Sequence, residues 1–392
     1  MRRTLSLFGL TAVLLAVVLA HPASTPATAQ SDALGAHNVY ALGVFSYPDH
    51  VRAIIDVLVP RTEVIVEARS SDTLWVLVHD LNRTVRGWVE ADFLEYEDRK
   101  AVLNLPVSAE VMFIASESPR TGDYTAIDLE AYPVIPDRLG GALKIAQSGV
   151  VLGSDPHVIS KVGDCISDNK NFLSPFGWGD YSLGNYGSLQ PVIDQFASSL
   201  AFDSQSAYDG LVTNAALDPL FSNPLACQPG ESPLRCEYRV HNPAVAVIMF
   251  GAQDLLFTPP DQFDRNLRQI VHETIQAGVI PLLSTFPGNL NRWDDAVRYN
   301  QIIVQIALDY DIPLMNLWLA LEALPHHGLD DDGRHLSVPI STPGDLRGEN
   351  LQRGYPQRNL VTLQALDAVW RGALEPSMGF LYPDVYTFPA IG

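Results

Sequence analysis

Three short segments, far apart in the chain, contain residue types that could carry out acyl transfer. They are Gly163–Cys165 (Gly-Asp-Cys), Gly251–Asp254 (Gly-Ala-Gln-Asp) and Asp332–His335 (Asp-Gly-Arg-His). Acyl transfer needs a nucleophile, a base that takes its proton, a group that orients the base, and donors for the developing oxyanion. A thiol, an imidazole, carboxylates and a carboxamide are present in these segments, which we therefore treat as parts of one candidate site.

The order of these segments resembles the SGNH (GDSL-type) hydrolases. That family has a G-D-S nucleophile turn, a G-x-N-D oxyanion block and a D-x-x-H base block. Two key letters differ, since Cys165 stands where the family has serine and Gln253 stands where it has asparagine. The resemblance implies an α/β fold, a three-layer α/β/α sandwich with a parallel sheet. It also implies hydrolysis of an ester or acyl bond without a cofactor.

The resemblance implies a role for each site residue. Cys165 would be the nucleophile, His335 the base, and Asp332 the group that orients His335. The backbone N–H of Cys165 and the side-chain amide of Gln253 would donate hydrogen bonds to the oxyanion. Family members have a glycine in a further block, and we nominate Gly210 for that position.

The two departures from the family pattern leave several functions open. A thiol is intrinsically a good nucleophile. Sulfur is larger than oxygen, however, and a displacement of about 1 Å can cost on the order of a hundredfold in rate. Gln253 keeps the carboxamide and adds a methylene, and losing an oxyanion donor costs ~10²–10³ in rate. The site could belong to an ester hydrolase, a thiol-dependent acyl transferase, or an inactive protein that binds carbohydrate or cell wall.

The elements that must position these segments are predicted from the pattern between residues 156 and 374. Apolar runs at 244–250 and 279–285 alternate with amphipathic segments that predict helices over 189–202, 261–277, 293–310 and 360–372. Strands separated by helices indicate right-handed crossovers and a parallel sheet covered on both faces. The strand predicted at 158–163 leads directly into Gly-Asp-Cys, and 244–250 leads into Gly-Ala-Gln-Asp. Functional loops gather at the carboxyl ends of such strands, so we expect the site there.

Residues 38–96 have a different pattern, with short alternating strands and no helical period. The run from Thr62 to Leu94, above all its Gly-Trp-Val, resembles the bacterial SH3-like domains of exported proteins. That resemblance implies a small all-β barrel in front of the α/β domain, and it implies cell-wall contact. Trp75 and Trp88 could be ligand platforms or barrel core.

A targeting segment precedes these domains. Residues 1–29 are predicted to be a signal peptide, because two arginines precede a short apolar run and a small-residue cleavage site. Export to a secreted or cell-envelope location follows, with an uncleaved anchor as the alternative. After cleavage we expect no stable membrane span. Residues 97–155 are treated as a connector that partly packs on its neighbours and in which 107–116 could belong to the barrel. Residues 375–392 are treated as a C-terminal tail.

The three cysteines become informative in an exported protein, because exported thiols tend to pair. Cys227 and Cys236 bracket a turn-rich loop, and we predict a disulfide between them. Cys165 is then the odd thiol. It is either the nucleophile or a small buried residue of the core.

Composition and charge narrow the classes of partner. The chain has 392 residues and a formal net charge of -20, which argues against nucleic acid and against anionic membrane surfaces. The sequence contains no glycine-rich phosphate loop, and the spacing of His326 and His327 does not resemble a metal-ligand set. We expect no cofactor and no metal. The expected partner is a small-molecule or polymeric ester, with cell-wall contact through the SH3-like domain.

Overall fold

The computed structural model describes residues 34–45, 48, 54–83, 85–108 and 124–378. These residues form an N-terminal antiparallel sheet and a C-terminal α/β domain. The predicted signal peptide and most of the predicted tail lie outside the described residues. Within the described ranges, no helix is long and apolar enough to cross a membrane.

The N-terminal part is a seven-stranded sheet with the order β3-β2-β6-β5-β4-β1-β7, in which neighbouring strands are antiparallel. Its strands are β1 (Leu34–Asn38), β2 (Leu42–Phe45), β3 (Ile54–Leu58), β4 (Glu63–Arg69), β5 (Trp75–Asp80), β6 (Arg86–Glu90) and β7 (Leu94–Tyr96). Strand β4 alternates between buried and more exposed side chains, as a strand with one face on a core does. The sheet starts at Leu34, before the predicted boundary at residue 38, because β1 pairs with both β4 and β7.

Two tryptophans of this sheet belong to its core. Trp88 is fully buried and Trp75 is only 5% exposed. The Trp75 ring contacts Phe45 edge to face, with 5.1 Å between ring centroids. Of the two roles that the sequence leaves open for these tryptophans, their burial supports a core role, in the N-terminal sheet, rather than that of a ligand platform.

The predicted connector packs against both of its neighbours. The 3-10 helix η2 (Arg99–Asn104) buries Val102 in the core of the N-terminal sheet, and Val107 forms an isolated bridge with Arg69. Further along, Leu129 is part of the core of the α/β domain. The α/β domain therefore begins before the predicted boundary at residue 156. Residues 109–116, which we considered as a possible extension of the barrel, lie outside the described residues.

The α/β domain is built on a parallel sheet with the order β12-β11-β10-β8. Its strands are β8 (Asp155–Gly163), β10 (Pro243–Met249), β11 (Ile280–Ser284) and β12 (Leu314–Met315), and a separate two-stranded pair joins β9 (Tyr181–Ser182) to β13 (Gly344–Asp345). Every residue of β10 and β11 is buried, as expected for strands covered on both faces. In the register of β8 and β10, Gly163 lies opposite Met249, so both strands end at the same edge.

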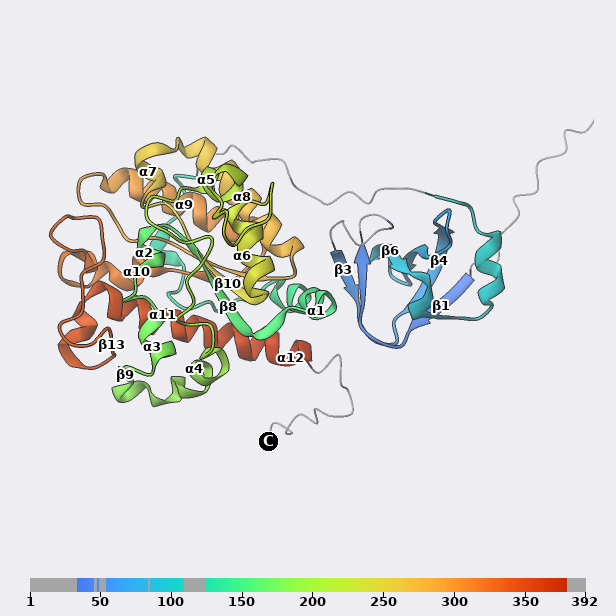
Figure 1. Ribbon diagram of the computed structural model, residues 1–392, viewed down its shortest axis with the longest axis horizontal. Helices are drawn as coiled ribbons and strands as arrows, with labels where there is room; N and C mark the ends of the chain where they lie inside the picture. The colour runs from blue at the N-terminus through green and yellow to red at the C-terminus, as the bar shows by residue number, and fades with distance from the viewer. Residues whose placement is uncertain (1–33, 46–47, 49–53, 84, 109–123, 379–392) are drawn as a thin grey trace, which may run out of the picture. The chain divides into compact units, whose positions relative to one another are not determined.

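Helices cover both faces of this sheet. On one face α6, α5, α8 and α9 contact one another in that order, and on the other α11 contacts α4 and α10, while α1 contacts α12 (Figure 1). Their bounds are α1 (Ala142–Leu152), α2 (Cys165–Asp168), α3 (Ser174–Trp178), α4 (Gln190–Phe196), α5 (Thr213–Leu217), α6 (Pro233–His241), α7 (Asp254–Phe257), α8 (Pro260–Gln276), α9 (Trp293–Tyr310), α10 (Leu317–Glu322), α11 (Gly354–Val369) and α12 (Glu375–Met378). A parallel sheet between two layers of helices is the predicted architecture.

Two predicted helices have different bounds in the structure. The helix expected over 189–202 ends at Phe196, and the chain turns so that Ser199 Oγ accepts a hydrogen bond from the Ile159 amide of β8 at 2.9 Å. The last helix starts at Gly354 rather than residue 360 and continues through a π-helical turn, Trp370–Leu374, into α12. Buried Ser377 lies beyond the predicted domain end at residue 374.

Gly251 begins the turn that follows β10, and its position tolerates no side chain. Its φ is +125°, which side-chain-bearing residues rarely adopt, and an added Cβ would lie 2.3 Å from the buried ring of Phe286. This glycine therefore lets the chain turn closely past the end of β11.

Gly251→Ala is expected to lower the free energy of unfolding by about 2–4 kcal/mol, because backbone strain and overpacking add. Gly179→Ala is the matched control, since Gly179 also has a positive φ of +76° but nothing lies within 4 Å of an added Cβ. That control should cost only ~1–2 kcal/mol. Urea denaturation of both variants measures the difference, and equal losses would contradict the close approach to Phe286.

Candidate active site

The candidate nucleophile lies on a sharp turn between β8 and α2. Gly163 ends the strand, Asp164 caps the helix, and Cys165 is its first residue. The Asp164 carboxylate accepts a hydrogen bond from the Ile166 amide at 3.1 Å. An added Cβ on Gly163 would lie 2.2 Å from the Met249 carbonyl oxygen, so only glycine fits here. Strand pairing and capping together fix the direction in which Cys165 leaves the sheet.

A buried arginine from α11 donates hydrogen bonds to this turn. Arg358 is fully buried; its Nη1 donates to the Ile166 carbonyl at 2.6 Å and its Nη2 donates to Ser167 Oγ at 3.0 Å. The guanidinium stacks on Phe172, 3.6 Å from the ring centroid. Burial lowers the pKa of Arg358 to about 10. We did not predict this residue, because nothing in the local sequence of α11 indicates a partner so distant along the chain.

The structure brings the three residues predicted to be catalytic into one hydrogen-bonded line. Cys165 Sγ lies 3.3 Å from His335 Nε2, and His335 Nδ1 lies 2.5 Å from Asp332 Oδ2. Burial opposes ionisation of Asp332, but hydrogen bonds from the His335 ring and from two backbone amides lower its pKa to about 2. Asp332 is therefore a carboxylate at neutral pH, and it can hold a proton on Nδ1 so that Nε2 faces the thiol.

The turn that carries His335 and Asp332 is anchored at several points. Leu329 and Leu336 form a β-bridge across its base, and the Asp330 amide donates to the His335 carbonyl at 2.8 Å. The Leu290 amide, in the loop after β11, donates to the Gly333 carbonyl at 2.9 Å. The base turn is thus tied to the same edge of the sheet as the nucleophile turn.

The oxyanion segment follows β10 and is joined to the nucleophile turn through Asp164. The second carboxylate oxygen of Asp164 accepts a hydrogen bond from the backbone amide of Gln253 at 3.3 Å. Asp254, which is also fully buried, accepts from both the amide and the hydroxyl of Thr213, at 3.0 and 2.6 Å. Burial, together with the nearby charge of Asp254, raises the pKa of Asp164 to about 6. Asp254 is structural, whereas Asp164 aligns the two loops.

The predicted oxyanion donors lie around this junction. Among the described residues, the Cys165 amide has no acceptor and the half-buried side chain of Gln253 makes no hydrogen bond. Gly210 is exposed, with a φ of +80°, in a turn that follows the bridge between Gly163 and Ala207. The amide of Cys165 and the carboxamide of Gln253 are thus available as donors, and Gly210 lies on an adjacent loop.

The resting thiol is a weak acid. Burial raises the pKa of Cys165 to about 12, and the negative charges of Asp164 and Asp209 add to this effect, while the charge of Arg334 opposes it. The thiol is therefore protonated at neutral pH. Attack by sulfur would require the proton to pass to His335 during the reaction, as for a serine nucleophile.

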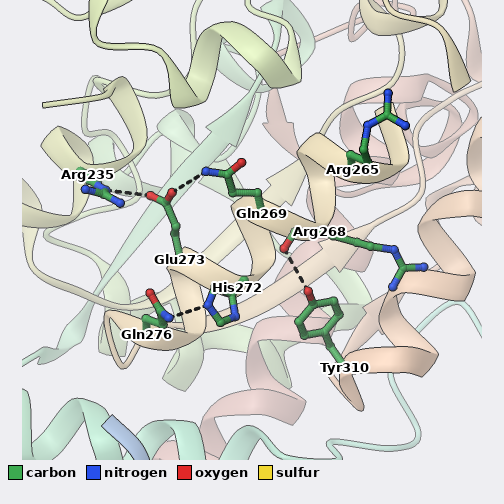
Figure 2. Close-up of a pocket in the computed structure, with 8 residues that line it drawn as sticks. All are labelled: Arg235, Arg265, Arg268, Gln269, His272, Glu273, Gln276 and Tyr310. Carbon is green, nitrogen blue, oxygen red and sulfur yellow. Dashed lines mark hydrogen bonds and ion pairs between the residues drawn. The ribbon is translucent and has the colours of Figure 1, made fainter. Parts of the chain in front are cut away.

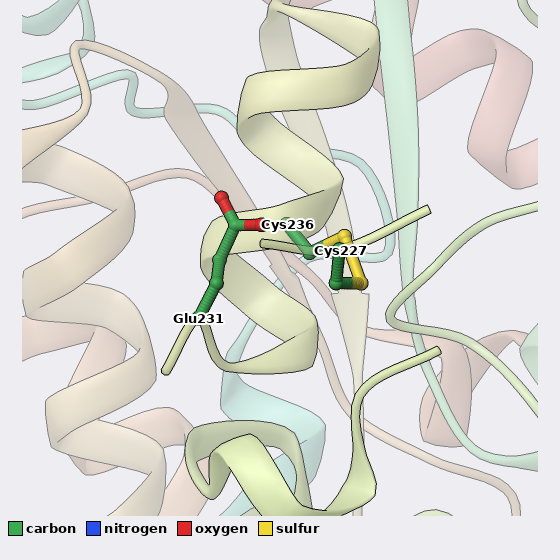
Figure 3. A group of neighbouring side chains, drawn as sticks. All are labelled: Cys227, Glu231 and Cys236. Carbon is green, nitrogen blue, oxygen red and sulfur yellow. A yellow bond between two sulfur atoms is a disulfide. The ribbon is translucent and has the colours of Figure 1, made fainter. Parts of the chain in front are cut away.

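Cys227 and Cys236 are joined by a disulfide, with an S–S distance of 2.07 Å and a Cα–Cα distance of 5.2 Å. Cys165 is the free cysteine. Glu231 lies beside the bridge, which gives a group of metal-ligating residue types (Figure 3). The two sulfurs are bonded to each other and Glu231 pairs with Arg239 at 2.8 Å, so this group is structural in the oxidised protein.

Two cavities of the α/β domain differ in their position relative to the catalytic line. The larger, about 470 Å³, lies along α8 and is lined by arginines that already have acidic partners, such as Arg235 with Glu273 at 2.9 Å (Figure 2). A cavity of about 310 Å³, here named the Arg334 cavity, lies beside the base turn. Its lining residues are Leu256, Asn289, Asn291, Arg292, Asp332 and Arg334. The Arg334 cavity adjoins the candidate site, because Asp332 belongs to both.

Comparison with known proteins identifies the class of this domain. Residues 176–339 match the model of the GDSL-like Lipase/Acylhydrolase family. The matched segment contains Gln253 and the Asp332–His335 turn and begins after Cys165. The chain therefore contains a GDSL-like lipase/acylhydrolase domain, which confirms that part of the predicted resemblance. No curated protein matches the chain.

Solved structures of hydrolases show limited similarity to the chain. A lipase/acylhydrolase from Enterococcus faecalis is 17% identical, with 55% of this chain and 96% of that chain covered and a TM-score of 0.37. A family 3 carbohydrate esterase from Clostridium thermocellum is 15% identical, with 55% and 98% covered and a TM-score of 0.37. A catalytic mutant of an acetylxylan esterase from Geobacillus stearothermophilus is 16% identical, with 54% and 95% covered and a TM-score of 0.34. The family assignment rests on the family model.

Alkylation of Cys165 by iodoacetamide is expected to accelerate by about tenfold per pH unit from pH 7 to pH 10, because the thiolate is the reactive form and its pKa is raised. The urea-unfolded protein is the control, in which the rate should level off near the ordinary cysteine pKa of about 8.5. A plateau below pH 8 in the folded protein would instead reveal a preformed thiolate–imidazolium pair and contradict the prediction.

Proposed function

We propose that the C-terminal domain hydrolyses an ester or acyl bond, with Cys165 as nucleophile, His335 as base and Asp332 as the residue that orients the base. The observation that carries this proposal is the continuous contact from Cys165 Sγ to His335 Nε2 at 3.3 Å and from His335 Nδ1 to Asp332 at 2.5 Å. The GDSL-like family match supports the same class of reaction.

The mechanism follows from the protonation states at the site. His335 Nε2 takes the thiol proton as Cys165 Sγ attacks the carbonyl carbon of the ester. The tetrahedral intermediate collapses when Nε2 gives this proton to the departing alcohol, and a thioester remains on Cys165. Water then attacks the thioester with Nε2 as its base, and the acid product leaves as the thiol is restored. The Asp332 carboxylate stabilises the imidazolium that forms in each half-reaction.

The oxyanion would be held by the Cys165 amide and the Gln253 carboxamide, with Gly210 as a further donor. Asp164 supports this arrangement, because one carboxylate accepts from the amides of Ile166 and Gln253 and so sets the distance between the two loops. Preorganised donors of this kind contribute on the order of 10²–10³ in rate each.

The competing function is a catalytically inactive protein that uses the fold to bind carbohydrate or cell wall. The raised pKa of the Cys165 thiol favours it, since a protonated thiol is a poor nucleophile. The extra methylene of Gln253 also favours it. These two departures from the family pattern are separable by mutation.

We further propose that the protein is exported and reaches the cell wall through an SH3-like N-terminal domain. The disulfide between Cys227 and Cys236 supports an oxidising location, and the antiparallel strands between residues 34 and 96 support the domain class. A wall polymer carrying O-acyl groups would then be the substrate presented to the site.

Turnover of p-nitrophenyl acetate by the chain from residue 30 onward is expected to fall by about 10³-fold or more in both Cys165→Ala and His335→Ala, since these residues act as a unit. Asp332→Asn should lose ~10²–10⁴-fold because the ring is no longer held in the right tautomer. Asp331→Asn is the matched control: among the described residues this exposed carboxylate of the same turn makes no hydrogen bond or ion pair with the His335 ring, so the substitution should leave turnover unchanged.

Two further variants separate an active thiol site from an inactive one. A gain in Cys165→Ser would show that the scaffold prefers a hydroxyl. If the native chain is silent while Cys165→Ser with Gln253→Asn is active, the fold is a hydrolase that has lost its chemistry. Absence of turnover in every variant would favour the binding protein.

Binding to the cell wall is measured by co-sedimentation of the full mature chain with purified peptidoglycan sacculi. Phe93→Ser should weaken retention several-fold, because Phe93 is a large exposed aromatic side chain in the 3-10 helix Ala91–Phe93 that joins β6 to β7. Leu220→Ser, at an exposed apolar residue of the α/β domain, is the control and should have no effect. Equal retention of all three proteins would remove the support for this contact surface.

A further inference from the structure

Arg334 directly precedes the candidate base His335, and its guanidinium lines the Arg334 cavity. Its side chain is half-buried, and in the described part of the chain it has neither an ion pair nor a side-chain hydrogen bond; only its backbone amide is used, donating to Asp332 Oδ1 at 2.9 Å. Its charge lowers the pKa of Cys165 against the larger opposing effects. A half-buried guanidinium without an ion-pair partner, in a cavity that adjoins the candidate site, is available to an anionic ligand.

The other polar groups of the Arg334 cavity are mostly donors. Arg292 is held in place by Asp295, 2.8 Å from both its Nε and Nη2, and by the carbonyl of Leu255. Asn289 is only 4% exposed, and its Oδ1 accepts from the Asn291 amide at 3.0 Å, which leaves its NH₂ group as a donor. The carboxylate of the cavity, Asp332, is occupied by the His335 ring and two amides.

We propose that the Arg334 cavity binds an anionic group of the substrate, a carboxylate or a phosphate, next to the scissile ester, with Arg334 as its principal ligand and Arg292 and Asn289 as further donors. A guanidinium presents two parallel N–H groups that match a carboxylate or phosphate. The cavity, about 310 Å³, is at the small end of ligand pockets, so it accommodates one such group with its immediate substituents. This inference rests on the proposed ester hydrolysis.

The surroundings make recognition of the anion a short-range effect. Asp330 and Asp331 are exposed on the same turn, and the whole chain carries a formal net charge of -20, so the long-range field does not attract anions. The selectivity must therefore arise from direct contact with Arg334. Contacts of this kind are less sensitive to salt than steering by surface charge.

The test compares esters that share a reacting group and differ in charge. On the alcohol side, 4-acetoxybenzoate and 4-acetoxyphenyl phosphate are compared with the neutral methyl 4-acetoxybenzoate. On the acyl side, the 4-nitrophenyl monoester of adipic acid is compared with 4-nitrophenyl pentanoate. For at least one anionic ester, Arg334→Gln should lower kcat/KM by about 10- to 100-fold, the loss expected for one charge-assisted contact. The neutral partner reports the effect that loss of this charge has on the Cys165 thiol itself, so the anionic-to-neutral ratio is the readout.

Two variants control this comparison. Arg334→Lys keeps the charge without the planar fork, so it should restore only part of the preference for the anionic ester. Arg138→Gln removes an exposed arginine beside Asp311 and Leu314, where β12 begins, at the opposite edge of the sheet, and should leave every ratio unchanged. Equal anionic-to-neutral ratios in the native chain and Arg334→Gln for all esters would overturn the proposal.

A failure of the proposed hydrolysis is recognised separately. If neither the native chain nor Cys165→Ser turns over the neutral esters, calorimetric titration with 4-hydroxybenzoate and methyl 4-hydroxybenzoate tests the cavity alone. If Arg334→Gln binds 4-hydroxybenzoate at least about tenfold more weakly than the native chain does, the anion site is supported even in a protein without turnover. No binding of the anion, or equal binding of the two compounds, would overturn it.

Discussion

The hydrogen bonds of one buried carboxylate align the loops that form the candidate site. Asp164 lies where β8 ends, and its two oxygens accept from Ile166 on the nucleophile turn and from Gln253 on the loop after β10. This link is possible because the parallel register brings Gly163 opposite Met249. The register of β8 and β10, together with the hydrogen bonds of Asp164, therefore sets the position of Cys165 relative to Gln253.

This arrangement puts charged side chains into the interior of the α/β domain. Asp164, Asp254 and Arg358 are fully buried, and each is matched by several polar partners. Removing one partner of such a network costs more than the contact contributes, because the remaining charge is left buried. Buried polar contacts thus connect the nucleophile turn to α11 and to the loop after β10. The base turn is connected to the same edge of the sheet through the loop after β11.

The sequence predicts the strands, helices and site residues that a local pattern or a motif identifies. Strands β10 and β11 are continuous apolar runs and α9 has a clear helical period, so they are predicted close to their true bounds. Cys165, Asp332 and His335 are found through the order of their motifs. Arg358 has no such signal, because α11 buries residues on every side and does not show which of them meets a distant turn. The early end of α4 depends on a bond from Ser199 to β8, which is equally non-local.

The contact between Arg358 and Ile166 joins residues separated by 192 positions. Contacts of such long sequence separation form late in folding, after the intervening loops have closed. A chain emerging from the ribosome therefore contains the Cys165 thiol before α11 has been synthesised. Cys165, His335 and the supporting Arg358 can therefore come together only after the chain has been synthesised through α11.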